Sequence, residues 1–354
     1  MRLVSIGKVA DKMFLARTLY DGRGMMILPV GANLSTHKSQ LLNFNIQYLY
    51  VTDDLSEGIE MSQLLSEETR IEIHTTIKRL KKVYQPVADH KSKTFFDLPY
   101  MKLGKMIADD ITSQNTVHID VTELLINRVY EFDHDLNVGI VAALIGRAFG
   151  MPRDDIYHLA MGGFLHDLGL LALPDEIMVK FGKNQMDFNE QLVYKQYPLI
   201  GYNMIKHNNV LNLITKSSIL QHKERYDGTG YPGKKKGDGI SMGARIVGLA
   251  NAFEKLYFSR DPGLQLKIFD IVRHILKDAG QAFDPAVVSV FIKHLEIFPN
   301  GTMVKLNDGR MGLVERQNEG QIARPVVRAI SKDGIEVIDL LKSDNPVIED
   351  IAEM

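Results

Sequence analysis

The chain has 354 residues, of which 45% are hydrophobic and 24% charged, as in ordinary globular proteins. Its formal net charge is -2, which gives no electrostatic reason to expect a nucleic-acid partner or a membrane surface. It has no cysteine, which excludes disulfides and thiolate metal sites and fits a cytoplasmic location. The most apolar stretch, residues 136–149, is too short for a membrane span, and the N-terminus lacks a signal-peptide pattern. We therefore expect a soluble protein.

Residues 1–55 predict a small mixed α/β module. A hairpin is expected within residues 13–30, because two β-rich runs flank the turn signal at residues 21–24. A short helix and a strand at residues 48–51 complete this module. Residues 56–96 are charged with apolar residues at helical spacing, which predicts a connecting helix.

Residues 97–298 predict a helical domain, because apolar residues recur at helical spacing and strand signals are rare. Glycine and proline end or open some of these helices, as at Gly150 and Pro152. The predicted helices span residues 132–149, 152–168, 189–207, 210–222 and 243–258.

Residues 299–354 predict a small β module. Short runs of alternating or β-branched residues are separated by turn signals at residues 307–309 and 333–334. The expected fold class is therefore mainly α, with an all-helical domain flanked by a small N-terminal α/β module and a small C-terminal β module.

Histidines and acids stand at the ends of three predicted helices. His134 is in the first turn of one helix, His166 and Asp167 end the next, and His222 ends a later one. Imidazole and carboxylate groups suit Zn, Fe or Mn, and an adjacent His-Asp pair can face one ion from a helix end. Each histidine alone is more often a surface or core residue than a ligand, whereas the set together favours a metal centre.

These residues carry a resemblance to the HD-GYP domain that covers most of the central helical block. Tyr130-x-x-x-His134 matches the first family motif, and His166-Asp167 follows His134 by 32 positions, as in the family. Residues 222–232 match the signature loop, His-His-Glu-Arg-x-Asp-Gly-x-Gly-Tyr-Pro, at ten of eleven positions. The last family motif, Ala-Arg-Ile followed by Asp-x-Phe-Asp-Ala-Leu, matches residues 244–246 and 251–256.

The resemblance implies a metal-dependent site for the turnover of cyclic di-GMP. In the family, two or three metal ions are held, the Asp of the His-Asp pair bridges two of them, and a metal-held hydroxide attacks a phosphate. Two cations about 3.5–4 Å apart can neutralise the anionic phosphodiester and stabilise the leaving oxygen. The candidate metal ligands carried over to this chain are His134, His166, Asp167, His222 and Asn251.

Four positions depart from the family pattern. Leu170 replaces the Lys of His-Asp-x-Gly-Lys, and Tyr197 replaces the His of His-Pro. Lys223 replaces the second His of the signature loop, and Asn251 replaces the last metal-binding Asp. An ammonium group about 4 Å from a divalent ion costs roughly 8 kcal/mol at an effective dielectric of 20. The departures therefore remove ligands and add a repelling charge.

The remaining ligands favour one divalent metal, Fe, Mn or Zn, held by His134, His166 and Asp167. Asn251 can still offer a neutral oxygen to this ion. We do not expect a binuclear site, and we assign no catalytic residue.

Four residues are candidates for nucleotide binding: Lys223, Arg225, Tyr231 and Arg260. Lys223 could hold a phosphate in place of the lost metal ion, and Arg260 aligns with a family arginine that contacts the nucleotide. A second interpretation of the signature loop is structural. Its glycines allow a tight turn, and an ion pair between Arg225 and Asp227 could stabilise that turn.

Three functions follow as alternatives. The first is a degenerate HD-GYP signalling protein, inferred to be bacterial, that binds cyclic di-GMP or a related nucleotide as a receptor with little or no hydrolysis. The second is an active phosphodiesterase with a reduced metal site. The third is a scaffold without nucleotide that binds a protein partner through the signature loop or the β module. A homodimer is left open.

Overall fold

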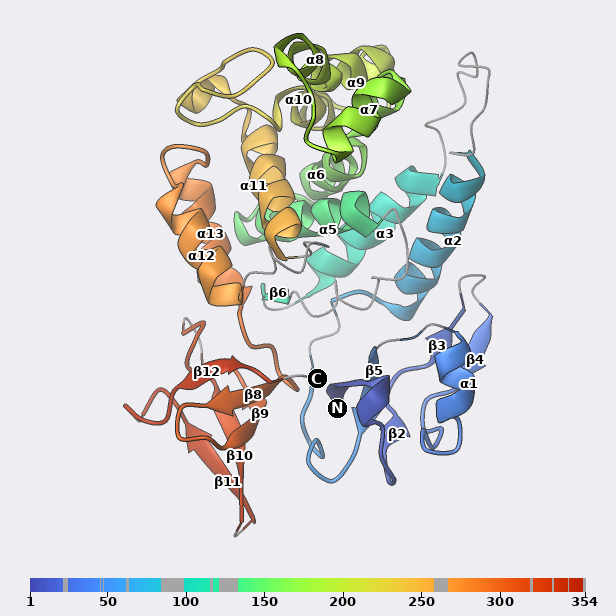
Figure 1. Cartoon of the computed structure of the whole chain (residues 1–354), viewed down its shortest axis with the longest axis vertical. Coiled ribbons are helices and arrows are strands. Elements are labelled where there is room, and N and C mark those ends of the chain that lie inside the picture. Colours follow the sequence, from blue (N-terminus) through green and yellow to red (C-terminus); the bar gives the residue numbers. More distant parts are fainter. Residues whose placement is uncertain are drawn as a thin grey trace. The chain divides into compact units, whose positions relative to one another are not determined.

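The computed structural model describes residues 1–21, 25–44, 46, 48–61, 64–83, 99–114, 117–120, 133–257, 267–318, 321–332, 334–342 and 344–352 (Figure 1). Contacts divide the chain into two compact units. Unit 1 comprises Met1–Lys91, Asp120–Glu131 and Lys293–Met354, and unit 2 comprises Ser92–Ile119 and Phe132–Ile292. The predicted division into four consecutive segments stays a prediction.

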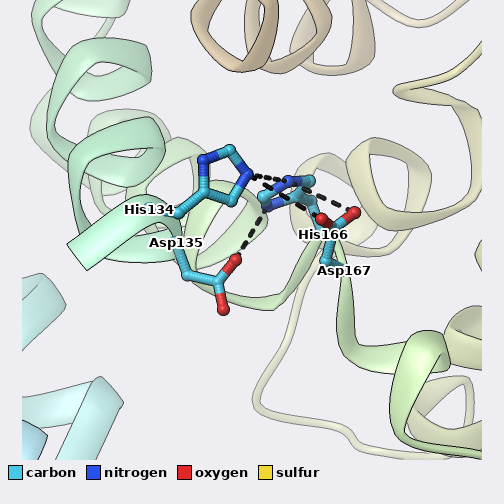
Figure 2. Close-up of side chains that lie close together, drawn as sticks. All are labelled: His134, Asp135, His166 and Asp167. Carbon is cyan, nitrogen blue, oxygen red and sulfur yellow. Dashed lines mark hydrogen bonds and ion pairs between the residues drawn. The ribbon is translucent and has the colours of Figure 1, made fainter. Parts of the chain in front are cut away.

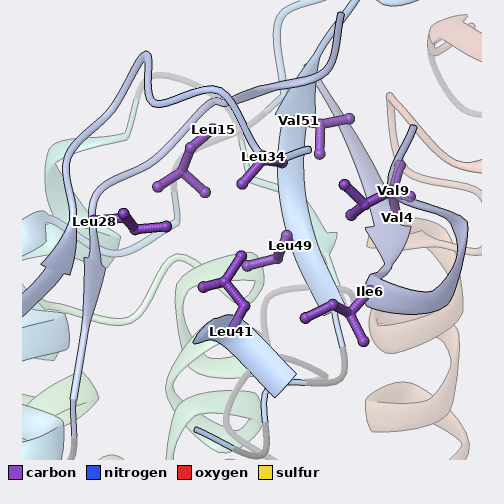
Figure 3. Close-up of a cluster of buried hydrophobic side chains, with 9 residues drawn as sticks. All are labelled: Val4, Ile6, Val9, Leu15, Leu28, Leu34, Leu41, Leu49 and Val51. Atoms are coloured by element: carbon purple, nitrogen blue, oxygen red, sulfur yellow. The ribbon is translucent and has the colours of Figure 1, made fainter. Parts of the chain in front are cut away.

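The N-terminal part of unit 1 is a small α/β structure. Its three-stranded antiparallel sheet has the order β1-β5-β2, and β3 pairs antiparallel with β4 around the predicted hairpin turn, whose residues 22–24 lie outside the described residues. The elements are β1 (Arg2–Ser5), η1 (Ile6–Lys8), β2 (Phe14–Leu15), β3 (Leu19–Tyr20), β4 (Met26–Leu28), α1 (Lys38–Asn43) and β5 (Tyr48–Thr52). The core is formed by Val4, Ile6, Val9, Leu15, Leu28, Leu34, Leu41, Leu49 and Val51 (Figure 3).

The C-terminal part of unit 1 is a five-stranded antiparallel sheet with the order β11-β10-β9-β8-β12. Its strands are β8 (Met303–Leu306), β9 (Met311–Arg316), β10 (Val326–Ser331), β11 (Gly334–Asp339) and β12 (Ile348–Ile351). Buried side chains from the inner strands, such as Val314 and Val327, form its core. Unit 1 also contains the helix α2 (Glu67–Val83) and the short strand β7 (Leu295–Glu296).

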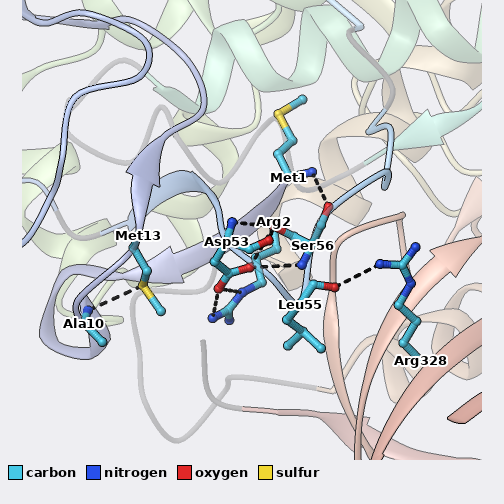
Figure 4. Close-up of polar contacts among 8 residues, drawn as sticks. All are labelled: Met1, Arg2, Ala10, Met13, Asp53, Leu55, Ser56 and Arg328. Atoms are coloured by element: carbon cyan, nitrogen blue, oxygen red, sulfur yellow. Dashed lines mark hydrogen bonds and ion pairs between the residues drawn. The ribbon is translucent and has the colours of Figure 1, made fainter. Parts of the chain in front are cut away.

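The two ends of the chain are joined within unit 1. The Arg328 guanidinium in β10 donates to the backbone carbonyl of Leu55 at 3.1 Å (Figure 4). It also donates to the backbone carbonyl of Glu57 at 2.7 Å. Beside this contact, Arg2 donates to Asp53 Oδ2 through Nε and Nη2, at 2.9 and 2.7 Å. Segments about 270 positions apart therefore belong to one folded unit.

Unit 2 is helical, which confirms the expected fold class. Its elements are α3 (Pro99–Ser113), β6 (Ile119–Asp120, at its boundary with unit 1), α5 (Asp133–Ala148), α6 (Arg153–Leu165), η2 (Leu168–Ala172), α7 (Asp175–Gly182), α8 (Phe188–Tyr194), α9 (Tyr197–Ile205), α10 (Leu213–Gln221), η3 (Gly237–Gly239), α11 (Met242–Tyr257), α12 (Ile268–Lys277) and α13 (Pro285–His294). The single helix predicted for residues 189–207 is two helices, because the chain breaks between α8 and α9 at residues 195–196. Within the described residues, no single helix is long and apolar enough to span a membrane. The helical segments 153–172 and 175–182 meet these two criteria only when taken together, and they are sharply bent relative to each other.

Glycines let the helices that carry the candidate ligands approach closely. A Cβ on Gly163 of α6 would lie 2.4 Å from Cα of Gly139 in α5, so the two helices touch through their backbones. A Cβ on Gly169 of η2 would lie 1.9 Å from the carbonyl oxygen of Tyr197 in α9. These two contacts place His166 beside α5 and bring Tyr197 next to the same turn.

Candidate metal centre

Three predicted ligands converge where α5 begins and α6 ends. His134 Nε2 lies 3.3 Å from His166 Nε2, and the Asp167 carboxylate lies 3.8 Å from His134 and 3.3 Å from His166 (Figure 2). Two ligands of a tetrahedral zinc, each at about 2.0–2.1 Å, are themselves about 3.3 Å apart. The spacing of these atoms therefore suits a shared metal ion.

The outer nitrogen of each imidazole faces an acceptor. His166 Nδ1 donates to the Gly163 carbonyl at 2.7 Å, and His134 Nδ1 donates to the buried Glu254 carboxylate. When Nδ1 carries the only proton of each ring, the two Nε2 lone pairs lie 3.3 Å apart, which is unfavourable unless a cation lies between them. Although burial lowers it, the neighbouring Asp167 raises the pKa of His166, so a proton on its Nε2 can take the place of such a cation. Acceptors that orient imidazoles in this way are typical of metal-binding histidines.

Buried oxygen atoms without partners add to this fit. Oδ1 of Asp167 and Oδ1 of Asn251 are both buried, and neither has a hydrogen-bond partner among the described residues. A buried acceptor left unpaired is costly, so such atoms mark places where an ion or ligand belongs. Although burial raises it, the neighbouring His166 holds the pKa of Asp167 well below its usual value, so the carboxylate is ionised. The His134, His166 and Asp167 donors fit one divalent cation, and Asn251 lines a pocket with His222.

Asp135 is a fourth acid in the cluster that could hold a metal, and the sequence interpretation missed it. Its Oδ1 lies 3.6 Å from Nδ1 of His166, on the side of the ring opposite to the Nε2 atom that faces Asp167 (Figure 2). One ion cannot contact both sides of the ring, so Asp135 supports His166 electrostatically. Burial raises the pKa of Asp135 to about 6. The only sequence signal for it is its position directly after His134.

His222 also lies close to Asp167, but its Nε2 atom is hydrogen-bonded to the hydroxyl of another residue. Its Nδ1 donates to the Ile219 carbonyl at 2.9 Å, and the Tyr197 hydroxyl lies 2.9 Å from Nε2. Because Nδ1 carries the proton, the hydroxyl donates to the Nε2 lone pair, although His222 Nε2 is also only 3.5 Å from Asp167. Burial lowers the pKa of His222 to about 3 and raises the pKa of Tyr197 far above its usual value, so both groups are neutral.

Two family departures lie in one apolar cluster. Tyr197 is almost completely buried, and Leu170 packs against it together with Tyr231. The rings of Tyr197 and Tyr231 contact edge to face, with centroids 6.5 Å apart. Positions at which the family has a lysine and a histidine are thus part of a hydrophobic cluster in this chain.

A pocket of about 450 Å³ has His222, Lys223, Asn251 and Lys255 among the residues that line it. The loop after His222, one face of α11, and residues 274–284 complete the wall. Lys223 is half-buried, and burial together with the neighbouring Lys255 lowers its pKa to about 7.

The signature loop is held by its own side chains. Arg225 Nε donates to the Thr229 hydroxyl at 3.0 Å and lies 3.8 Å from Asp227, while the Glu224 carboxylate accepts from the backbone nitrogens of Gly233 and Lys235. These contacts accord with the structural interpretation of Arg225, although its side chain also lines the pocket.

Of the other candidates for nucleotide binding, Tyr231 lines the pocket, and Arg260 lies outside the described residues. Glu254 and Lys255 were not assigned from the sequence. Glu254 stands where the last family motif has its second acid, which is the signal that could have found it.

The helical region is similar to known proteins. Residues 114–287 match the family model described as an HD domain. A cyclic di-GMP phosphodiesterase of Borreliella burgdorferi is 28% identical over 210 residues, which cover 59% of this chain and 54% of that protein. A cyclic di-GMP phosphodiesterase response regulator of Xanthomonas campestris pv. campestris is 32% identical over 154 residues, covering 43% and 40%.

Among solved structures, one described as an HDG"Y"P protein from Bdellovibrio bacteriovorus matches with a TM-score of 0.47 and 13% identity, covering 82% of this chain and 97% of that one. The chain spans about half the length or less of the curated relatives reported above. The resemblance drawn from the motifs is confirmed: residues 114–287 match the HD-domain model, and the similar proteins are named cyclic di-GMP phosphodiesterases.

Proposed function

We propose that the chain is a receptor that binds cyclic di-GMP or a related nucleotide beside one divalent ion, with little or no hydrolysis. The observation that carries this proposal is the hydrogen bond from Tyr197 to His222 Nε2, because it takes the lone pair that a second ion would need. The relatives support the nucleotide class, since they are named for cyclic di-GMP.

One ion would be held by His134, His166 and Asp167, and it would supply positive charge to a phosphate oxygen. Lys223 faces the neighbouring pocket and is placed to contact the same phosphate or the next one. Binding needs only such cations, whereas cleavage by the family chemistry needs a second ion to stabilise the leaving oxygen. The chain retains the groups for the first task and lacks ligands for the second.

The alternative is a working phosphodiesterase, which the names of the relatives favour. The groups at His134, His166 and Asp167 are intact, so one ion could still activate water. A protein partner, a homodimer and a cytoplasmic location stay predictions.

Metal analysis and calorimetry distinguish these functions. After incubation with Mn²⁺ or Fe²⁺, we expect one ion per chain, heat on titration with cyclic di-GMP, and no linear dinucleotide by chromatography at high protein concentration. Two ions per chain with release of linear dinucleotide would establish the enzyme instead. Absence of heat at high micromolar nucleotide, with and without metal, would contradict the receptor.

A further inference from the structure

Glu254 is a buried acid of α11 whose two carboxylate oxygens both contact α5. Its Oε2 accepts a hydrogen bond from Nδ1 of His134, and its Oε1 accepts one from Nδ2 of Asn137 at 3.4 Å. His134 and Asn137 are three positions apart, so they lie on one face of α5 in successive turns. Only 5% of Glu254 and 2% of Asn137 are exposed. The two helices therefore meet through one carboxylate that takes a donor from each turn.

The charge of Glu254 is balanced by no lysine or arginine side chain within ion-pair distance in the part of the chain that the structure describes. Its partner at that distance is His134. Burying a carboxylate without a cation is costly, so buried charges in proteins are paired or lie beside a metal ion. The imidazole of His134 stands between this carboxylate and the Nε2 atom of His166. A cation bound at Nε2 of His134 would therefore compensate the charge of Glu254 through the ring.

The sequence of α11 changes both acids of the last family motif. These acids fall at positions 251 and 254 of this chain. The first is replaced by the neutral Asn251, and the second by a glutamate, which is one methylene group longer than aspartate. Of the two carboxylates, α11 therefore keeps one, and this one contacts the outer nitrogen of a candidate ligand.

We propose that Glu254, held by Asn137, is a positioning residue of the metal centre. It fixes the ring of His134 so that Nε2 points at the other candidate ligands, and its charge makes the imidazole a stronger ligand. From behind the ligand, it thereby supplies the negative charge that position 251 has lost. The inference rests on the metal site of the proposed function, and it is independent of whether a nucleotide binds there.

Titration of the full, metal-free chain with Mn²⁺ tests the inference without any nucleotide. Glu254→Ala should raise the Mn²⁺ dissociation constant by about 10- to 100-fold, the usual cost of losing an outer partner of a metal-binding histidine. Glu254→Gln keeps an acceptor of the same length and loses the charge, so it should raise the constant by less. Asn137→Ala should weaken binding in the unchanged chain but have no further effect in Glu254→Ala, because Asn137 acts through Glu254.

A matched control is Glu72→Gln, which removes a buried carboxylate from α2 in unit 1, whereas the candidate ligands are in unit 2. It should leave the Mn²⁺ dissociation constant unchanged, which excludes a general effect of a lost buried charge. Urea unfolding of the metal-free variants measures any purely structural role of Glu254.

Glu254→Gln, which is close to glutamate in shape, decides the question if the alanine variant does not fold. If the Glu254 variants lose stability but bind Mn²⁺ as tightly as the unchanged chain, the inference is wrong and the proposed function stands. The same holds if Asn137→Ala weakens binding equally with and without Glu254. If the unchanged chain binds no Mn²⁺, the proposed function is wrong and the inference with it.

Discussion

The two halves of the candidate metal centre lie within a few ångströms of each other, yet they differ in the groups that face the histidine Nε2 atoms. In the open half, formed by His134, His166 and Asp167, the two Nε2 atoms lie 3.3 Å apart and both approach the Asp167 carboxylate. In the closed half, formed by His222 and Tyr197, a phenol hydroxyl donates to the equivalent lone pair. His166 and His222 both follow the end of a helix, and the Nδ1 atom of each donates to a backbone carbonyl three residues earlier. The two histidines therefore differ only in the group that faces their Nε2 atom.

This contrast indicates that the departures from the family pattern are coupled. Tyr197 belongs to an apolar cluster against which Leu170 packs, so both replacements contribute to one packed surface. Scattered loss would instead leave cavities or unpaired polar atoms. Among the buried oxygens without a hydrogen-bond partner in the described residues, Oδ1 of Asp167 lies at the candidate metal site.

The largest expected effect is loss of the metal from the open half. His166→Gln should weaken metal binding by at least about a hundredfold, since it removes a ligand whose Nδ1 contact is already optimised. His222→Gln should leave the metal content near that of the unchanged chain, because its lone pair is occupied. Metal analysis after dialysis measures both variants. Equal loss in the two would show that the halves do not differ.

The second prediction concerns a variant in which the family residues are restored. Tyr197→His, Lys223→His, Asn251→Asp and Leu170→Lys in one chain should raise the metal content from one ion to two, because ligands return to the closed half. Equilibrium dialysis with Mn²⁺ gives the number of ions. Uptake that stays at one ion would mean that the backbone around η2 and α9 no longer holds a binuclear geometry.

The close approach of η2 and α9 gives the third prediction. Gly169→Ala should lower the free energy of unfolding of unit 2 by about 3 kcal/mol, because the new Cβ would overlap the Tyr197 carbonyl oxygen. The control is Gly182→Ala in α7, where no atom lies within 4 Å and alanine favours the helix. Urea unfolding measures both. Equal stability of the two variants would contradict the packing of the closed half.

The smallest effect separates a structural histidine from the site histidines. His158 is buried, its Nδ1 donates to the Thr215 hydroxyl at 3.1 Å, and burial lowers its pKa below 6.5. The unfolded chain therefore binds the proton more readily, so the stability that neutral His158 contributes is full above pH 6.5 and is lost as the pH falls through the lowered folded pKa. His158→Gln should lose less stability than the unchanged chain between pH 7 and pH 5.5, with unchanged metal content. Identical pH profiles would exclude this role.

The proximity of His134, His166 and Asp167 could be predicted from motif spacing, because each sits at a helix end whose position follows from local periodicity; their role as metal ligands stays a prediction. The contacts that decide the chemistry were out of reach of that reasoning. The Tyr197 hydroxyl reaches His222 only because α9 packs on η2, and Glu254 reaches His134 across 120 positions.

The element predictions show the same limit. The break between α8 and α9 was missed, since apolar residues run across it, and α7, α12 and α13 were not predicted. In α12, buried Ile268, Ile271, Val272 and Ile275 carry a clear helical signal that could have been used. A hairpin and short strands at both ends were predicted, whereas the joining of the two ends by Arg328 depends on a contact no local pattern contains.

The Arg328 contact has a consequence for how the chain is made. A ribosome releases the N-terminal strands first, yet the β10 residue that ties them down emerges some 270 residues later. The helical unit lies between these two segments in sequence. It is therefore synthesised before β10, and it can fold before the N-terminal segment gains its contacts with Arg328. The segment around Leu55 therefore gains these contacts only after the helical unit has been synthesised, and a nascent chain that stalls within the helices lacks them.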